Sequence, residues 1–225
     1  MRAILSFRYS HRRLVLTPRK QPRQQRSRET VEAILEAAAQ LFQRHGYAGT
    51  TTNKIAERAG VSIGSLYQYF PNKDALLVAL AEHYLDRSAE QVGRVFARAA
   101  ERRPCLPDLL ADLVGEVAAL HTDRPALHRL LYDQAPRTPG LVSRFRQAER
   151  RIAGALADEL RRLGAGGPDP GLSALLAVQG IEAQLHGALL EPQDDGDTDA
   201  RLRAVTRLWH RALAEPGAAN PPHRP

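Results

Sequence analysis

Cysteine and long apolar runs are both scarce in this sequence. Only one of its 225 residues is a cysteine, Cys105, which excludes an internal disulfide framework and is typical of a reducing cytoplasm. The longest apolar run is about as long as LLVALA at 76–81, whereas a membrane-spanning helix needs roughly 20 residues. The N-terminal stretch is basic, and charged residues interrupt its apolar pieces, which argues against a secretory signal. We therefore expect a cytoplasmic protein with no membrane partner.

Acidic residues are absent from residues 1–26 and scarce up to residue 70. Residues 1–70 hold twelve Lys and Arg against four Glu, while the whole chain has a net charge of +7. The excess positive charge therefore lies in the first third of the chain. This asymmetry is expected if that part alone meets a polyanion such as DNA. A basic tail that is merely solvated is the alternative.

Apolar residues recur at helical spacing over most of the remaining chain. From Val31 they follow at three, four, seven, ten and eleven residues, with Ser27 suited to cap this helix and Gly46 to end it. Further helices are predicted at 51–58, 62–69, 73–100, 107–122, 125–134, 138–163, 170–190 and 198–214. No segment shows convincing strand character, and 43% of residues are hydrophobic, enough for a core. We predict an all-α fold with about nine helices.

The sequence divides into four parts. Residues 1–27 are basic and read as a flexible arm. The Pro- and Gly-containing residues 216–225 form a loose tail. The division of the part between them into a three-helix head at 28–88 and a larger helical domain at 89–215 follows from the family resemblance given below.

The two short helices within 51–70 have the proportions of a helix-turn-helix, with Gly60 in the turn. Small or flat residues, Ile63, Gly64 and Ser65, begin the second helix. Such residues permit close approach to base edges in the major groove. Ile63 is suited to pack against a thymine methyl group, and Ser65 to exchange a hydrogen bond with a base edge.

Hydroxyl and ammonium groups flank this surface. Tyr67, Tyr69 and Lys73 are suited to contact phosphate oxygens. Thr51 and Thr52 place hydroxyls beside free backbone N–H groups at the start of the preceding helix. Each has a structural alternative, since a tyrosine ring can pack in the core and Thr51 can simply cap its helix.

Four matching segments make residues 28–88 resemble the DNA-binding domain of the TetR family of bacterial transcriptional regulators. They are IL-x-AA-x-x-LF at 34–42, HGY at 45–47, TT-x-x-x-IA-x-x-AGVS-x-GSLY-x-YF at 50–70, and NKDALL at 72–77. Lys54 departs from this pattern, because the family usually has an acid there. The basic arm is also longer than in most members; it is disordered or reaches a minor groove.

The resemblance implies that residues 62–69 are the recognition helix for double-stranded DNA. Ser62, Ile63, Gly64 and Ser65 match groove-facing positions of the family, and Tyr67, Tyr69 and Lys73 match phosphate-contacting positions. It further implies a sequence-specific, ligand-responsive regulator, most often a repressor, that acts as a homodimer on a palindromic operator. Residues 89–215 then form the ligand-binding and dimerisation domain.

Two C-terminal helices carry apolar stripes suited to homodimer formation. Pairing of the helices at 170–190 and 198–214 with their copies would build a four-helix interface. The stripes comprise Leu172, Leu175, Leu176, Leu185 and Leu189, then Leu202, Val205, Leu208, Trp209 and Leu213. Their alternative role is in the core of a single chain.

An internal pocket for an unidentified small-molecule effector is expected among the helices of the larger domain. Aromatics make up only 5% of the sequence, which argues weakly against a wide pocket lined with rings. The candidate lining residues, each also suited to the plain core, are Tyr84, Phe96, Leu113, Val117, Leu131, Tyr132, Phe145, Gln179 and His186.

No catalytic or metal-binding motif stands out. The histidines are scattered; His121, Asp123 and His128 lie near one another, but a helix break at Pro125 separates them. We expect no enzyme activity, no cofactor and no metal site. A non-specific nucleic-acid binder that uses the basic arm, and a small all-α enzyme, are the alternatives to a transcriptional regulator.

Overall fold

The computed structural model describes residues 25–190 and 197–216, and in these ranges the chain forms nine α-helices and no strand. The predicted all-α fold is confirmed. Most of the predicted arm and tail, and the acidic loop before the last helix, lie outside the described residues. The helices are α1 (Gln25–Gly49), α2 (Thr52–Arg58), α3 (Ile63–Tyr69), α4 (Lys73–Arg102), α5 (Leu106–Asp123), α6 (Pro125–Gln134), α7 (Pro139–Leu163), α8 (Pro170–Leu190) and α9 (Thr198–Leu213).

Local capping sets several helix boundaries. The side chains of Thr51, Ser62 and Asn72 accept hydrogen bonds from backbone N–H groups in the first turns of α2, α3 and α4. At Gly46 the backbone leaves helical geometry with φ 64°, as predicted for the end of the long first helix. The predicted cap at Ser27 is wrong, because α1 already begins at Gln25.

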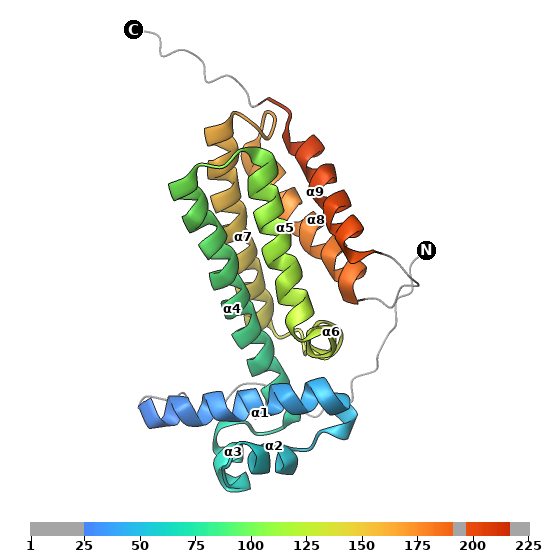
Figure 1. Cartoon of the computed structure of the whole chain (residues 1–225). Helices are drawn as coiled ribbons and strands as arrows, with labels where there is room; N and C mark the ends of the chain where they lie inside the picture. The colour runs from blue at the N-terminus through green and yellow to red at the C-terminus, as the bar shows by residue number, and fades with distance from the viewer. Residues whose placement is uncertain (1–24, 191–196, 217–225) are drawn as a thin grey trace.

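The described residues form two hydrophobic cores, and α4 runs from one into the other (Figure 1). In the first core, α1, α2, α3 and the start of α4 bury residues such as Phe42, Leu66 and Leu76. The second core lies among α4, α5, α7, α8 and α9. The predicted domain boundary after residue 88 therefore falls inside one continuous helix.

Helix α6 lies at the junction of head and body. Its Leu127 and Leu130 are buried in the core of the head, although the helix follows α5 of the body in sequence. Figure 1 shows α6 beside α1, at the end of the body nearest the head. None of the described helices combines the length and apolarity needed to cross a membrane.

Candidate nucleic-acid interface and cavity

The α2–α3 turn holds α3 on the outer face of the head. Gly60 has φ 67°, a left-handed conformation that favours glycine, and the Val61 N–H donates to the Ala56 carbonyl at 3.0 Å. Ile55 and Leu66 are fully buried and fix the two helices on α1 and α4. The predicted helix-turn-helix is therefore present, with the rest of α3 free to face a partner.

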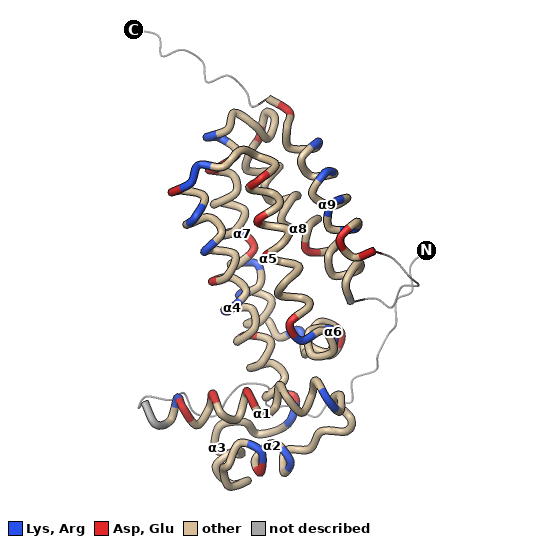
Figure 2. Tube along the Cα trace, in the orientation of Figure 1, with Lys and Arg blue, Asp and Glu red and all other residues tan. Residues whose placement is uncertain are grey.

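The N-terminal end of α3 is exposed, and Figure 2 shows that the helix carries no charged residue. Ile63 is 37% exposed. The Ser62 hydroxyl accepts from the Ser65 N–H at 3.0 Å and lies 2.8 Å from the Ser65 hydroxyl. A β-carbon at Gly64 would meet only the Ser62 Oγ, at 3.8 Å. Glycine costs about 1 kcal/mol relative to alanine inside a helix, and nothing within the described chain requires it here.

Hydroxyl groups from two helices meet at the edge of this surface. Tyr67 is 40% exposed, and its hydroxyl lies 3.0 Å from the Thr52 Oγ1. Thr51 caps α2 by accepting from the Lys54 N–H at 3.3 Å, as its structural alternative predicts. The Lys54 ammonium donates to the Gly49 carbonyl at 3.2 Å, so it remains beside the start of α2.

Two predicted phosphate contacts, Tyr69 and Lys73, also make contacts inside the head. Tyr69 is only 8% exposed, and its ring belongs to the core of the head rather than to the flank of α3. The Lys73 ammonium donates to the carbonyls of Tyr47, at 2.6 Å, and Thr50, at 3.0 Å. It also lies 3.9 Å from the centre of the Tyr47 ring, and desolvation lowers the pKa of Lys73. A phosphate contact by Lys73 therefore competes with bonds inside the head.

The basic excess predicted from the sequence lies mostly outside the described residues. Within residues 25–70, five Lys and Arg face four Glu, whereas the first 24 residues hold seven Lys and Arg and no acid. The head itself is close to neutral. Thr50, the first residue of the matching segment at 50–70, is fully buried and donates its hydroxyl to the Gly46 carbonyl at 2.8 Å, closing the end of α1.

A cavity of about 210 Å³ lies in the body, lined by α4, α5, α6, α7 and α8. The predicted lining residues that it contains are Tyr84, Leu113, Val117, Leu131, Tyr132 and Phe145. Three predictions need correction. Phe96 packs in the body core, Gln179 is exposed on α8, and His186 lies beside the cavity wall, stacked on Tyr132 with ring centres 3.6 Å apart.

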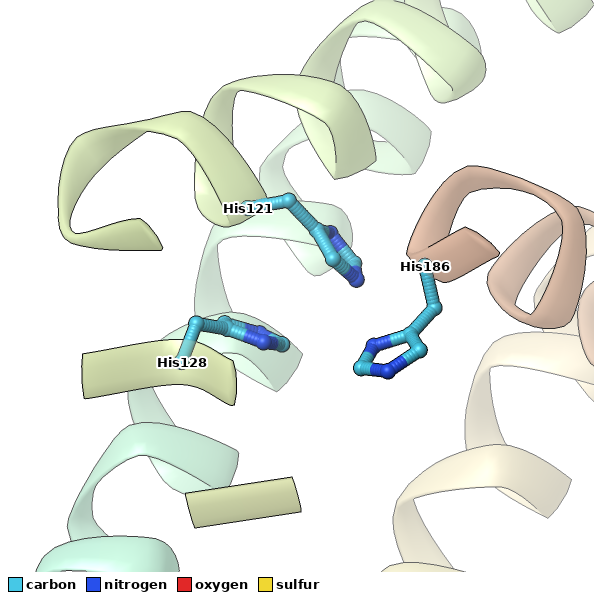
Figure 3. A group of neighbouring side chains, drawn as sticks. All are labelled: His121, His128 and His186. Atoms are coloured by element: carbon cyan, nitrogen blue, oxygen red, sulfur yellow. The ribbon is translucent and has the colours of Figure 1, made fainter. Parts of the chain in front are cut away.

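Polar groups interrupt the apolar wall at one place, where α5, α6 and α8 meet. His121 and His128 lie with ring centres 4.2 Å apart, and His186 lies 6.0 Å from the first and 6.2 Å from the second (Figure 3). A Glu182 carboxylate oxygen is 3.4 Å from the His121 Nε2. The sequence signals were the short break between the first two histidines and the i, i+4 spacing of Glu182 and His186.

The protonation of this cluster reflects burial and mutual charge. Burial alone would lower the pKa of His121, but the hydrogen bond and charge of Glu182 outweigh it, and this pKa is raised. Desolvation, followed by the charge of His121, lowers the pKa of His128 to about 4. Burial would raise the pKa of Glu182, yet the facing histidines, with His121 first, lower it. Glu182 is 39% exposed, because its carboxylate opens on the cavity.

Two family models match the chain. The model "Bacterial regulatory proteins, tetR family" matches residues 34–80, and "Tetracyclin repressor-like, C-terminal domain" matches residues 105–213. The HTH-type transcriptional repressor AcnR of Corynebacterium diphtheriae is 28% identical over 181 residues, which cover 77% of this chain and 86% of AcnR. With several other curated regulators, the match spans only 22% to 46% of the relative's length.

Solved structures show the same fold. A putative TetR-family regulator from Mesorhizobium loti superposes with a TM-score of 0.68 at 21% identity, covering 85% of this chain and 100% of that one. SmeT, the repressor of the Stenotrophomonas maltophilia multidrug efflux pump SmeDEF, gives a TM-score of 0.61 at 26% identity and covers 88% and 98%.

Proposed function

This chain belongs to the TetR family of bacterial regulatory proteins, and on that premise we propose that it is a ligand-responsive repressor that binds a palindromic operator as a homodimer. One observation carries the proposal. The exposed end of α3 keeps a glycine, Gly64, that no contact within the described chain requires. A helix face of this kind suits close approach to base edges.

The proposed DNA contacts come from both short helices. Ser62, Ile63, Gly64 and Ser65 would face the major groove, where the neutral side chains read bases rather than neutralise phosphates. The proposed phosphate contacts are Thr51, Thr52, Tyr67 and Lys73. The Tyr69 ring packs in the core of the head and supports α3 from its buried side.

The proposed dimer uses α8 and α9. Leu172 and Leu176 on α8 and Leu208 on α9 remain 51% to 53% exposed, whereas Leu185 and Leu213 of the same stripes are buried in the body core. The buried leucines serve the core of the single chain, and we propose that the exposed ones form the dimer interface. Exposed leucines on paired helices suit an isologous interface. A dimer would set two copies of α3 in successive major grooves, about 34–36 Å apart.

The cavity supports an effector-controlled mechanism. An effector that binds one arrangement of the body more tightly than another shifts the population of DNA-competent dimers. The route to the head runs through α4 and α6, which both contribute to its core. The relatives are transcriptional regulators, and we propose no catalytic role and a cytoplasmic location.

Footprinting on DNA from the chain's own locus tests this function. We expect a dimer by analytical ultracentrifugation, protection of a two-fold symmetric site, and affinity that falls steeply with salt. A variant that lacks residues 1–24 separates this proposal from a non-specific binder, because specific protection should survive the deletion. A protein that is strictly monomeric and binds no DNA duplex from the locus would contradict the proposal.

A further inference from the structure

Three imidazole rings from three different helices converge at one place beside the cavity, where His121 and His128 belong to its wall. His121 comes from the last turn of α5, His128 from α6 and His186 from α8 (Figure 3). One ring nitrogen of each lies within 4.8 Å of a nitrogen of the other two. His121 is 1% exposed, and the other two are partly buried. These three helices therefore bring three potential metal-ligand nitrogens together at one place.

The hydrogen bond of His121 to the backbone orients its second ring nitrogen toward Glu182. Its Nδ1 lies 2.8 Å from the Val117 carbonyl, so Nδ1 donates and Nε2 points toward Glu182, 3.4 Å away. Histidines that bind metals are held in this way, with the second nitrogen bonded to a carbonyl. The arrangement fixes both the tautomer and the ring orientation.

His128 supplies a second available lone pair. Its buried Nδ1 has no hydrogen-bond partner among the described residues. A neutral imidazole is the form that binds a metal ion.

We propose that His121, His128 and His186 bind a divalent transition-metal ion of the Zn²⁺ class, with Glu182 as the fourth ligand. Three imidazoles and one carboxylate suit such ions rather than Mg²⁺ or Ca²⁺, which prefer oxygen ligands. Zn–N bonds of about 2.0–2.1 Å in tetrahedral geometry place ligand atoms about 3.3 Å apart. The His121–Glu182 distance already matches this value, whereas the three imidazole nitrogens lie within 4.8 Å of one another and would move closer together on metal binding.

The position of the site gives the metal a route to the head. His128 directly follows Leu127, whose backbone N–H donates to the Gln43 side chain of α1 at 2.6 Å. At the start of the same helix, Arg124 pairs with Glu36 of α1 at 2.8 Å. A metal that draws His128 toward His186 therefore pulls on a helix attached to the head. This coupling rests on the proposed function, whereas metal binding itself does not.

Zn²⁺ titration of the tag-free full chain, monitored by calorimetry after treatment with a chelator, tests the site. We expect one Zn²⁺ per chain, and binding at least 10-fold weaker in His128→Ala. His83→Ala is the matched control, because His83 is exposed and lies outside the cluster. Absence of wild-type binding, or equal affinity in His128→Ala, would overturn the site.

A second variant gives a new absorption band when the metal binds, so its result does not depend on a loss of binding that misfolding could also cause. In His186→Cys loaded with Co²⁺, we expect a near-ultraviolet thiolate-to-metal band that the wild type lacks, because thiolates bind the same class of ions. The native Cys105 lies about 24 Å away along α5 and gives no such band. A folded His186→Cys protein that binds Co²⁺ without this band would exclude residue 186 as a ligand.

DNA binding with and without Zn²⁺ tests the coupling separately. We expect at least a 5-fold change in operator affinity in the wild type and none in His128→Ala. Zn²⁺ binding without a change in DNA affinity would overturn the coupling and leave the site standing. A protein that binds no DNA at all contradicts the proposed function, and the titration then still decides the metal site.

Discussion

The Arg124 guanidinium of α6 lies 2.8 Å from the Glu36 carboxylate of α1, across 88 positions of sequence. This ion pair and the Leu127–Gln43 hydrogen bond join the body to the head beside the cavity. Arg124 is the N-cap residue of α6, and Leu127 and His128 both lie in its first turn. In the proposed mechanism, these contacts would carry a change in the cavity to the helices of the head.

Replacement of Glu36 by Gln should lower stability at pH 7 by about 0.5–1 kcal/mol, a small value because both side chains are partly exposed. The Arg124 hydrogen bond lowers the pKa of Glu36 in spite of partial burial. The ionised form therefore stabilises the fold above the unfolded pKa of about 4.3, and this contribution is lost as pH falls through the lower folded value.

Urea unfolding of the wild type and Glu36→Gln at pH 7 and at pH 3.5 measures this effect. The stability difference should shrink at the lower pH. In a double-mutant cycle with Arg124→Ala, the two changes should be non-additive. An equal difference at both pH values would show that Glu36 acts through packing rather than through its charge.

Replacement of Gly64 by Ala should separate folding from DNA binding. The added methyl group meets only the Ser62 Oγ, and alanine is the better helix former. The free energy of unfolding should therefore stay the same or rise by up to about 1 kcal/mol, and the melting temperature should not fall. Operator affinity should fall about 10-fold, because the methyl group occupies the space of the base edges. Unchanged operator affinity in a folded Gly64→Ala variant would show that the DNA does not approach the start of α3.

Tyr67→Phe removes one exposed hydroxyl and should weaken operator binding about 3- to 10-fold with little loss of stability. Lys73→Ala serves as the contrast. It leaves the carbonyls of Tyr47 and Thr50 without their donor and should cost stability as well as affinity. Gel-shift titrations at one fixed salt concentration, paired with thermal melts, distinguish the two. A Tyr67→Phe protein that melts early yet binds normally would make Tyr67 a structural residue.

Gly180 on α8 lies directly beneath the Trp209 ring of α9, where a β-carbon would overlap the ring atom Cζ2. The indole N–H donates to Gln184 at 2.9 Å, which holds the ring in place. Gly180→Ala should therefore destabilise the protein by about 1–3 kcal/mol. Gly154→Ala, an exposed helical site with open space, should instead stabilise it slightly. Equal effects of the two changes in chemical unfolding would mean that α9 readily moves away from α8.

The sequence by itself determined the helices, because their signals are local. Apolar spacing, the caps at Thr51 and Ser62, and the break at Gly60 all act within a few residues. The same locality placed the helix-turn-helix and the exposed start of α3. Six of the nine residues predicted to line the cavity do line it, because helical spacing alone indicates which face of a helix points inward.

Tertiary packing alone decided which side chains meet. Tyr67 and Tyr69 are two positions apart on one helix and point about 200° from each other, so the packing of α3 on α1 and α4 exposes one and buries the other. His121, His128 and His186 look scattered in sequence, because helical periodicity fixes the face of a residue but not its neighbours on other helices. Only the crossing of α5, α6 and α8 brings the three rings together.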